Sequence, residues 1–256
     1  MWVRTDNRKL FTGLLVALIA LAWMSLWVWG QSPYGRFLDH GQLTDVNSED
    51  ATLLVFFVAA WTLMVFAMML PTSLPLITMF HTMTSDRQNH MWLMVLLISG
   101  YVGIWMGFGV AVHLGDLVLH EVVEQSAWLE ANSWSIGAGV LILAGVYQFT
   151  PLRYQCLDKC RSPMSFIAGH WSGGNEQMQA LRLGVDHGIF CVGCCWSLML
   201  LMFAVGAGSV GWMLALGTVM AVEKNMAWGR QLGKPLGVVL LTSGLIIALG
   251  VRSWPW

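Results

Sequence analysis

The segment DHGIFCVGCCW begins at Asp186 and combines an aspartate, a histidine and three cysteines. Thiolate sulfur and imidazole nitrogen are ligands that Cu(I) and Zn(II) take readily. On an α-helix, His187, Cys191 and Cys194 fall within an arc of about 60°, and Cys195 lies just beyond it. The spacing therefore predicts a soft-metal site whose core ligands are His187 and the three cysteines, with Asp186 as a further contributor.

Two local geometries are compatible with this segment. His187 and Cys194 would lie about 10 Å apart along an ideal helix, which is too far to hold one ion together. Either Cys191 and Cys195 bind an ion with help from another helix, or the chain is unwound around its two glycines. In the second geometry Cys191 and Cys194 form a knuckle at the start of a helix, where unpaired N–H groups and the helix dipole stabilise thiolates.

Two further cysteines, Cys156 and Cys160, precede this segment in a predicted inner loop, residues 151–183. They are four residues apart, and thiols at that spacing can share an ion. We expect them to act as a loop relay that exchanges metal with a cytosolic chaperone.

Methionines and a carboxylate extend the candidate ligand set. Met64 and Met68 share one face of an apolar run that also contains Pro71 and Pro75. Thioether sulfur is a ligand for Cu(I), although most of the 17 methionines serve as flexible packing material. The prolines free backbone carbonyls one turn earlier, so we expect a kinked or broken helix beside the site. Glu223 ends another apolar run on the same side.

The elements that position these residues are expected to be membrane helices. The chain has 256 residues, of which 57% are hydrophobic and 11% charged, whereas a soluble domain has about 25% charged residues. Because about 20 apolar residues span a bilayer as a helix, we predict an all-α, polytopic membrane helical bundle in one integral membrane domain, residues 1–256. The seven expected transmembrane segments are 10–29, 51–79, 91–113, 134–150, 188–205, 209–225 and 235–251.

The basic residues orient this bundle. With the N-terminus in the cytoplasm, every Lys and Arg except Arg36 and Arg252 falls on the inner side, as the positive-inside rule requires. We therefore expect a cytoplasmic N-terminus and a periplasmic C-terminus. All the cysteines then face the reducing cytoplasm and remain thiols. The net charge of −1 gives no reason to expect a nucleic-acid partner.

A second candidate site lies on the predicted outer side. His113, Asp116, His120 and Glu124 share one face if the third helix extends beyond the membrane. Such a face could capture a cation from the periplasm, but a solvated amphipathic extension has the same pattern. Both interpretations stay open.

Several motifs occur together over residues 51–225. They are AMMLP at 67–71, GVYQFTPL at 145–152, CLDKCRSP at 156–163, GIFCVGCCW at 188–196, SLM at 197–199 and EK at 223–224. In combination they resemble a bacterial family described as predicted metal-binding integral membrane proteins. The resemblance implies metal binding and a multi-pass protein of the bacterial inner (plasma) membrane.

We interpret the chain as a protein for trafficking, delivery or transport of copper, or alternatively zinc, rather than as an enzyme. Its expected partners are the metal ion, the lipid bilayer, and a cytosolic metal chaperone or a larger membrane complex. A non-catalytic subunit or assembly factor of such a complex is an alternative, for which the 15 tryptophans would supply contacts. A membrane thiol oxidoreductase is another, but its exchange with a quinone or periplasmic partner conflicts with cysteines confined to the inner side.

Overall fold

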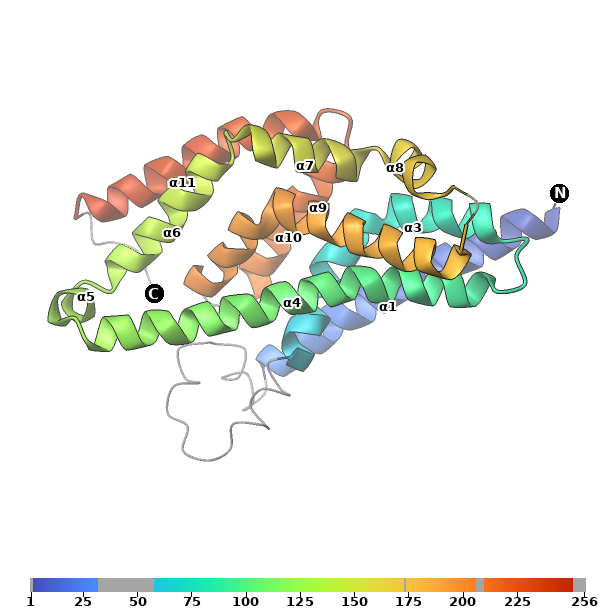
Figure 1. Cartoon of the computed structure of the whole chain (residues 1–256). Helices are drawn as coiled ribbons and strands as arrows, with labels where there is room; N and C mark the ends of the chain where they lie inside the picture. Colours follow the sequence, from blue (N-terminus) through green and yellow to red (C-terminus); the bar gives the residue numbers. More distant parts are fainter. Residues whose placement is uncertain (1, 32–57, 173, 206–209, 251–256) are drawn as a thin grey trace.

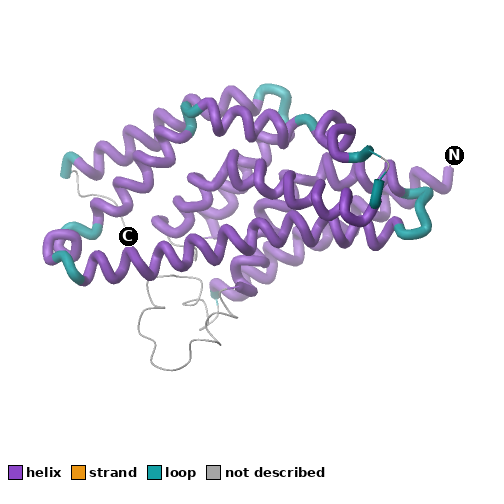
Figure 2. The backbone as a smooth tube through the Cα atoms, viewed as in Figure 1, coloured by secondary structure: helices purple, strands orange, loops and turns teal. Residues whose placement is uncertain are grey.

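The computed structural model describes residues 2–31, 58–172, 174–205 and 210–250. Helices make up nearly all of these residues, and no strand occurs among them (Figures 1 and 2). The all-helical class predicted from the sequence is confirmed. The helices are α1 (Trp2–Gly30), α3 (Leu70–Thr84), α4 (His90–Glu124), α5 (Ala127–Ala131), α6 (Trp134–Tyr147), α7 (Pro151–Arg161), α8 (Pro163–His170), α9 (Glu176–Val205), α10 (Val210–Asn225) and α11 (Gly233–Ala248), with a π-helical turn η3 (Val65–Met69) and a 3-10 turn η4 (Gly229–Leu232).

Helix α9 is the central element of the bundle, because α4, α6, α7, α8 and α10 all pack against it. Its closest neighbour is α4, and Figure 1 shows the two helices side by side. A Cβ atom added at Gly184 of α9 would lie only 2.0 Å from the carbonyl oxygen of Leu97 in α4. Glycine at this crossing therefore lets the two backbones touch, which fixes the rotation of α9 and the direction of its cysteines.

The proline-containing segment is one helix with a local irregularity rather than a broken helix. Residues 58–64 are helical and continue through η3 into α3, so that Val58–Thr84 forms one long span. Pro71 lies in the first turn of α3 and Pro75 lies inside it. The irregularity is the wide turn η3, whose last residue, Met69, offers its carbonyl to the hydroxyl of Thr72 at 2.7 Å. Wide turns of this kind commonly occur at functional sites.

Five described helices are long and apolar enough to cross a membrane. They are Leu10–Gly30, Val58–Thr84, His90–Glu124, Glu176–Met202 and Gly229–Ala248. Helices α6 and α7 would form a sixth span only as a pair bent by 67°. Helix α10, with 16 residues, does not reach the required length. The predicted number of seven spans is therefore not reached among the described residues.

The fourth expected segment, 134–150, ends early for a local reason. The hydroxyl of Thr150 accepts a hydrogen bond from the backbone N–H of Arg153 at 3.4 Å, and Pro151 follows as the first helical residue. A capping threonine followed by proline starts a new helix, so the chain turns into α7 after Tyr147. Parts of four other predictions lie outside the described residues: positions 51–57 of the second segment, residue 209 of the sixth, residue 251 of the seventh, and the two outer arginines at 36 and 252.

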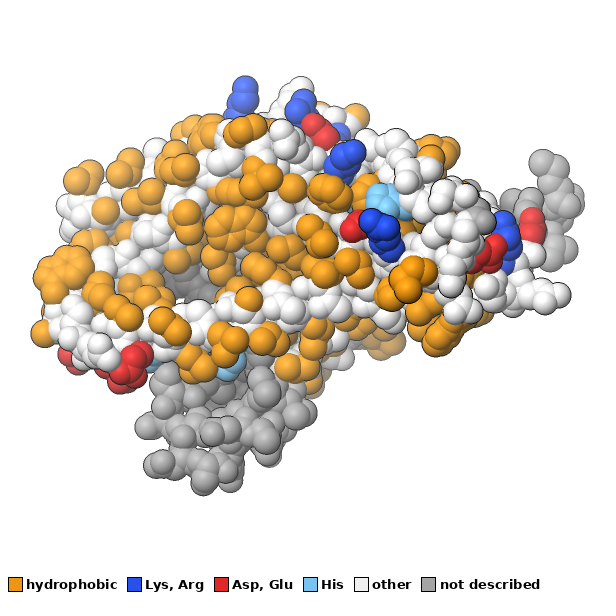
Figure 3. All heavy atoms as spheres, viewed as in Figure 1, with side chains coloured by type: hydrophobic (Ala, Val, Ile, Leu, Met, Phe, Trp, Pro, Cys, Tyr) orange, Lys and Arg blue, Asp and Glu red, His pale blue; other side chains and the backbone are white. Residues whose placement is uncertain are grey.

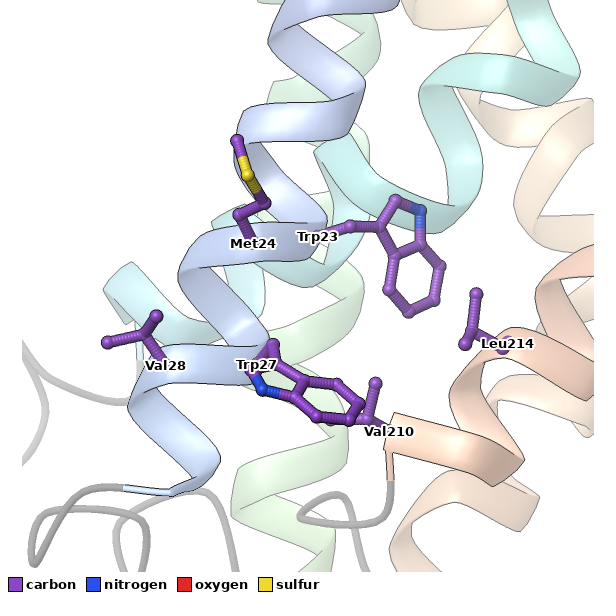
Figure 4. A pocket seen from close by; sticks show the side chains of 6 residues that line it. All are labelled: Trp23, Met24, Trp27, Val28, Val210 and Leu214. Carbon is purple, nitrogen blue, oxygen red and sulfur yellow. The ribbon is translucent and has the colours of Figure 1, made fainter.

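Large apolar side chains cover much of the surface. Figure 3 shows them across the face formed by α4, α6 and α9, where charged side chains are few and lie at the top, right of centre and at the lower left of this view. Between α1 and α10 the surface forms an entirely apolar groove of about 460 Å³, into which the rings of Trp23 and Trp27 project (Figure 4). Monomeric soluble proteins rarely expose contiguous apolar surface on this scale.

Candidate metal centre

All five cysteines lie in one core cluster, although they come from two helices. Cys191, Cys194 and Cys195 of α9 are at most 2% exposed, and Cys156 and Cys160 of α7 are 8% exposed. Each carries a free thiol. The structure thus brings together the two cysteine groups that lie about thirty residues apart in the sequence; we call these residues the thiol cluster.

Helix α7 supplies two members of this cluster, and this corrects the prediction of a cysteine relay in a loop. Because the cap at Thr150 starts a helix, Cys156 and Cys160 fall on its inner face, one turn apart. Cys160 lies close enough to Cys191 and Cys194 for their thiols to interact. Cys156 lies against Gly193, where an added Cβ would be 2.7 Å from the Cys156 sulfur. These two thiols are therefore buried next to the cysteines of α9 rather than presented to solvent.

Helix α9 is continuous through the cysteine segment, which excludes the alternative in which the chain is unwound around the two glycines and leaves the regular helix. The helix begins at Glu176, after Asn175, whose side-chain oxygen accepts hydrogen bonds from the backbone N–H groups of Gln177 and Met178. Cys191 is therefore near the middle of a 30-residue helix. The expected stabilisation of its thiolate by a helix N-terminus does not apply, because the effect is confined to the first turn.

The thiols of α9 bond to the helix itself. Cys194 and Cys195 donate to the carbonyl oxygen of Cys191 at 3.1 Å and 2.8 Å, respectively. Consistent with this, no three His, Cys, Asp or Glu side chains of the described residues form a group that could hold a metal ion. Metal binding at this cluster would require Cys194 or Cys195 to lose its proton and rotate away from the carbonyl.

Three residues from other segments approach the thiol cluster. The hydroxyl of Tyr101 in α4 is 3.2 Å from the Cys191 sulfur and 3.2 Å from the Met69 carbonyl oxygen. The thioether sulfur of Met69 is 3.9 Å from the Cys195 sulfur. The ammonium of Lys224 in α10 is 2.9 Å from the Cys191 sulfur and 4.0 Å from the Cys195 sulfur. The cluster is therefore bordered by an aromatic hydroxyl, a thioether and a cation.

The charge of Lys224 is directed at sulfur because the adjacent carboxylate is engaged elsewhere. Glu223 forms an ion pair with Arg153 of α7, and both side chains are buried. Lys224, 6% exposed, instead reaches the hydroxyl of Thr72 at 3.3 Å and the two cysteine sulfurs. A buried cation is costly unless an anion lies beside it, and a cysteine thiolate is the group placed to serve as that anion.

The remaining predicted ligands lie around the cluster rather than inside it. His187 is buried one turn before Cys191, where its Nε2 atom is 3.1 Å from the Ser73 hydroxyl and its ring stacks on that of Tyr101. Asp186 faces away and pairs with His170 at 2.9 Å. Glu223, as described, is held by Arg153.

The methionine contact differs from the predicted one by a single position. Met64 and Met68 are both buried in the same core. Met68 packs toward α10, since a Cβ at Gly217 would be 3.5 Å from its Cγ atom. Met69 is the methionine whose sulfur reaches a cysteine. The wide turn η3 rotates the chain relative to a regular α-helix. Residues on its two sides therefore do not share the faces that α-helical periodicity predicts for them.

A family model described as PpoB2, copper chaperone, matches residues 58–247. The chain belongs to this family. The search of curated proteins and the search of solved structures each give no match. The family match supports the resemblance to a metal-binding family that the motifs indicated, and it connects this family with copper.

The part of the chain matched by the PpoB2 family model runs from the helix preceding η3 into α11. It includes all five cysteines together with Met69, Tyr101 and Lys224. It excludes α1, so the candidate centre lies wholly within the part of the chain that defines the family.

Sequence reasoning missed Tyr101 and Lys224, which the structure places within hydrogen-bonding distance of Cys191. Tyr101 carries no recognisable signal, because it is one aromatic residue inside a long apolar helix. Lys224 had one: a lysine at the end of an apolar run, next to a glutamate, in one of the motifs shared with the metal-binding family. In the structure the neighbouring Glu223 pairs with Arg153, which leaves Lys224 directed at the cysteines.

The outer residues lie far along α4, which extends to Glu124 as the second site required. His113, Asp116 and His120 are half-buried, whereas Glu124 is exposed. Asp116 and His120 line a cavity of about 670 Å³ between α4 and α6, whose other lining residues are mostly apolar. The structure thus brings Asp116 and His120 to one cavity, and the role of the four residues as a cation site stays a prediction.

Proposed function

We propose that this protein is an integral membrane copper chaperone that holds Cu(I) at the thiol cluster of α7 and α9 and passes it to an acceptor. The observation that carries the proposal is the gathering of five free, buried thiols in one core of a chain that belongs to a copper chaperone family. Thiolate sulfur is a preferred ligand of Cu(I). Copper is thus the cargo of the protein, and zinc is the competing ion that the experiments must separate from it.

The arrangement suits an ion that has to be released again. Cu(I) is satisfied by few soft ligands, and the cluster offers more sulfur atoms than one ion needs. Cys191, Cys194 and Cys195 are the principal ligands in this proposal, and Cys160 is a neighbouring thiol to which the ion can shift. His187 is a supporting residue one turn away, in contact with Tyr101. Transfer between adjacent thiolates would avoid a free ion at any stage.

A membrane location is part of the same proposal. It rests on the five long apolar helices and on the exposed apolar side chains along them. The distribution of Lys and Arg supports a cytoplasmic N-terminus. In this orientation the start of α9 lies on the cytoplasmic side, and the acceptor or donor of copper there would be another metal chaperone or a membrane complex.

The experiment that tests the proposal measures metal bound to the detergent-purified protein and its transfer. Wild type is loaded anaerobically with Cu(I), freed of unbound metal and then mixed with an excess of a Cu(I)-specific chelator. We expect bound Cu(I) that survives the removal of free metal and then moves to the chelator. The matched variant is Cys191→Ser/Cys194→Ser/Cys195→Ser, and Ser197→Ala is a control at a buried position of the same helix.

The two variants should differ in the amount of Cu(I) that they retain. Serine oxygen is a harder ligand than thiolate sulfur, so the triple variant should retain no Cu(I), while Ser197→Ala should load like wild type. Copper retained equally by all three proteins would contradict the proposal. Wild type that binds Cu(I) without ever yielding it to the chelator would contradict the chaperone role and leave a structural copper site.

A further inference from the structure

The most unusual group at the thiol cluster is the buried ammonium of Lys224. It is 2.9 Å from the Cys191 sulfur and 4.0 Å from the Cys195 sulfur, a distance at which its charge acts on any ion bound between them. It cannot be accounted for by Glu223, whose carboxylate faces Arg153. A lysine that only closed the end of α10 would be expected to extend to solvent, yet this one is 6% exposed.

We propose that Lys224 makes the thiol cluster selective for a monovalent soft ion. Two thiolates, one Cu(I) and one ammonium together carry no net charge. Two thiolates, one Zn(II) and the same ammonium carry one positive charge, which is costly in a buried apolar core. This inference rests on the proposed function, because it assigns to that same site its preference between the two metals.

Zn(II) could regain neutrality by recruiting a third thiolate or by expelling the Lys224 proton, and each step costs free energy that Cu(I) binding does not require. Cys160 and Cys194 are near enough to serve, but one more buried thiol must then lose its proton. Zn(II) also favours four tetrahedral ligands, whereas Cys194 and Cys195 are both turned toward the Cys191 carbonyl. The geometry of the thiol cluster already suits an ion with few ligands, such as Cu(I). The Lys224 ammonium adds a charge penalty against Zn(II).

Removing the charge of Lys224 should shift the preference of the thiol cluster from Cu(I) toward Zn(II). In Lys224→Gln the side chain is neutral and brings no sulfur ligand to the site, so the complex of two thiolates with Cu(I) becomes a buried anion and that with Zn(II) becomes neutral. The control is Lys234→Gln, which removes a positive charge from an exposed position at the start of α11. Affinities for Cu(I) and Zn(II) are measured anaerobically on the detergent-purified proteins by competition with chromophoric chelators.

The ratio of Cu(I) affinity to Zn(II) affinity should fall on the order of 100-fold in Lys224→Gln, the size expected for one uncompensated buried charge. It should not change in Lys234→Gln. A ratio that stays at the wild-type value in Lys224→Gln would overturn the inference and leave the proposed function intact. Wild type that binds no Cu(I) would contradict the proposed function, and the role of Lys224 with it.

A second measurement needs no variant and keeps the inference testable if Lys224→Gln does not fold. Ag(I) and Cd(II) are both soft ions, but they differ in charge. Wild type loaded with Cu(I) should lose it to Ag(I) and keep it in the presence of Cd(II). Displacement of Cu(I) by Cd(II) as readily as by Ag(I) would show that softness alone sets the preference, and would overturn the role of Lys224.

Discussion

The sulfur atoms of Cys195 in α9 and Met69 in η3 lie 3.9 Å apart, and both side chains are at most 2% exposed. The contact joins the cysteine helix to the wide turn that precedes Pro71. It therefore connects two motifs that are more than a hundred residues apart in the sequence. A thioether in this position is available as a neutral ligand to an ion held by Cys195.

Met69→Leu should weaken Cu(I) binding. Leucine has nearly the same volume but no sulfur, so the fold should lose less than about 1.5 kcal/mol. We expect Cu(I) affinity to fall on the order of tenfold, as is common when a group supporting a metal is lost, while Zn(II) affinity stays unchanged. Met68→Leu is the matched control, because Met68 packs toward Gly217 instead. An equal loss in both variants would assign the effect to packing.

The burial of Cys156 and Cys160 makes their alkylation slow in the folded protein. A reagent in solution reaches a thiol that is 8% exposed only when α7 separates from α9. We expect little labelling of these two cysteines in native, detergent-purified protein and full labelling after unfolding, as measured by mass spectrometry of the digested chain. Labelling at the rate of the unfolded protein would restore the exposed loop relay that the sequence suggested.

The Arg153–Glu223 pair should contribute strongly to stability because both side chains are buried. Glu223→Gln leaves the Arg153 charge without its partner, which costs about 3–5 kcal/mol in comparable buried pairs. The control is Asp158→Asn, which breaks the exposed pair with Arg230 and should cost less than about 1 kcal/mol. Thermal unfolding in detergent measures both. Equal melting temperatures for the two variants would contradict this assignment.

The orientation in the membrane can be tested at the two ends of the bundle. The turn after α3 and the start of α9 lie at one end of the structure, and α5 lies at the other (Figure 1). Reporter fusions at Gln88 and Ser172 should therefore read cytoplasmic, and a fusion at Glu124 should read periplasmic. A cytoplasmic signal at Glu124 would contradict the proposed orientation of the bundle.

Helical periodicity was sufficient to predict the helical class and to single out Cys191, Cys194 and Cys195. It was not sufficient to predict where α9 begins. The segment 176–187 contains several polar residues, and its helical state depends on the cap at Asn175 and on packing against α4 through Gly184. The cysteines therefore lie mid-helix rather than at a helix start.

The partners of the thiols depend on tertiary packing, which sequence spacing does not encode. Residues 151–161 contain four charged side chains and were interpreted as a loop, yet the cap at Thr150 and the burial of Arg153 make them a helix. Likewise, the turn η3 moves Met69 into the place expected for Met68. Such one-residue shifts cannot be deduced from the spacing of methionines alone.

The most direct test of the central claim is X-ray absorption at the copper edge of the Cu(I)-loaded protein. The account predicts that copper in wild type is coordinated by sulfur. It also predicts that Cys191→Ser/Cys194→Ser/Cys195→Ser, prepared at the same concentration and shown to be folded, carries no sulfur-bound copper. The same sulfur coordination and the same copper content in the triple variant would contradict the account.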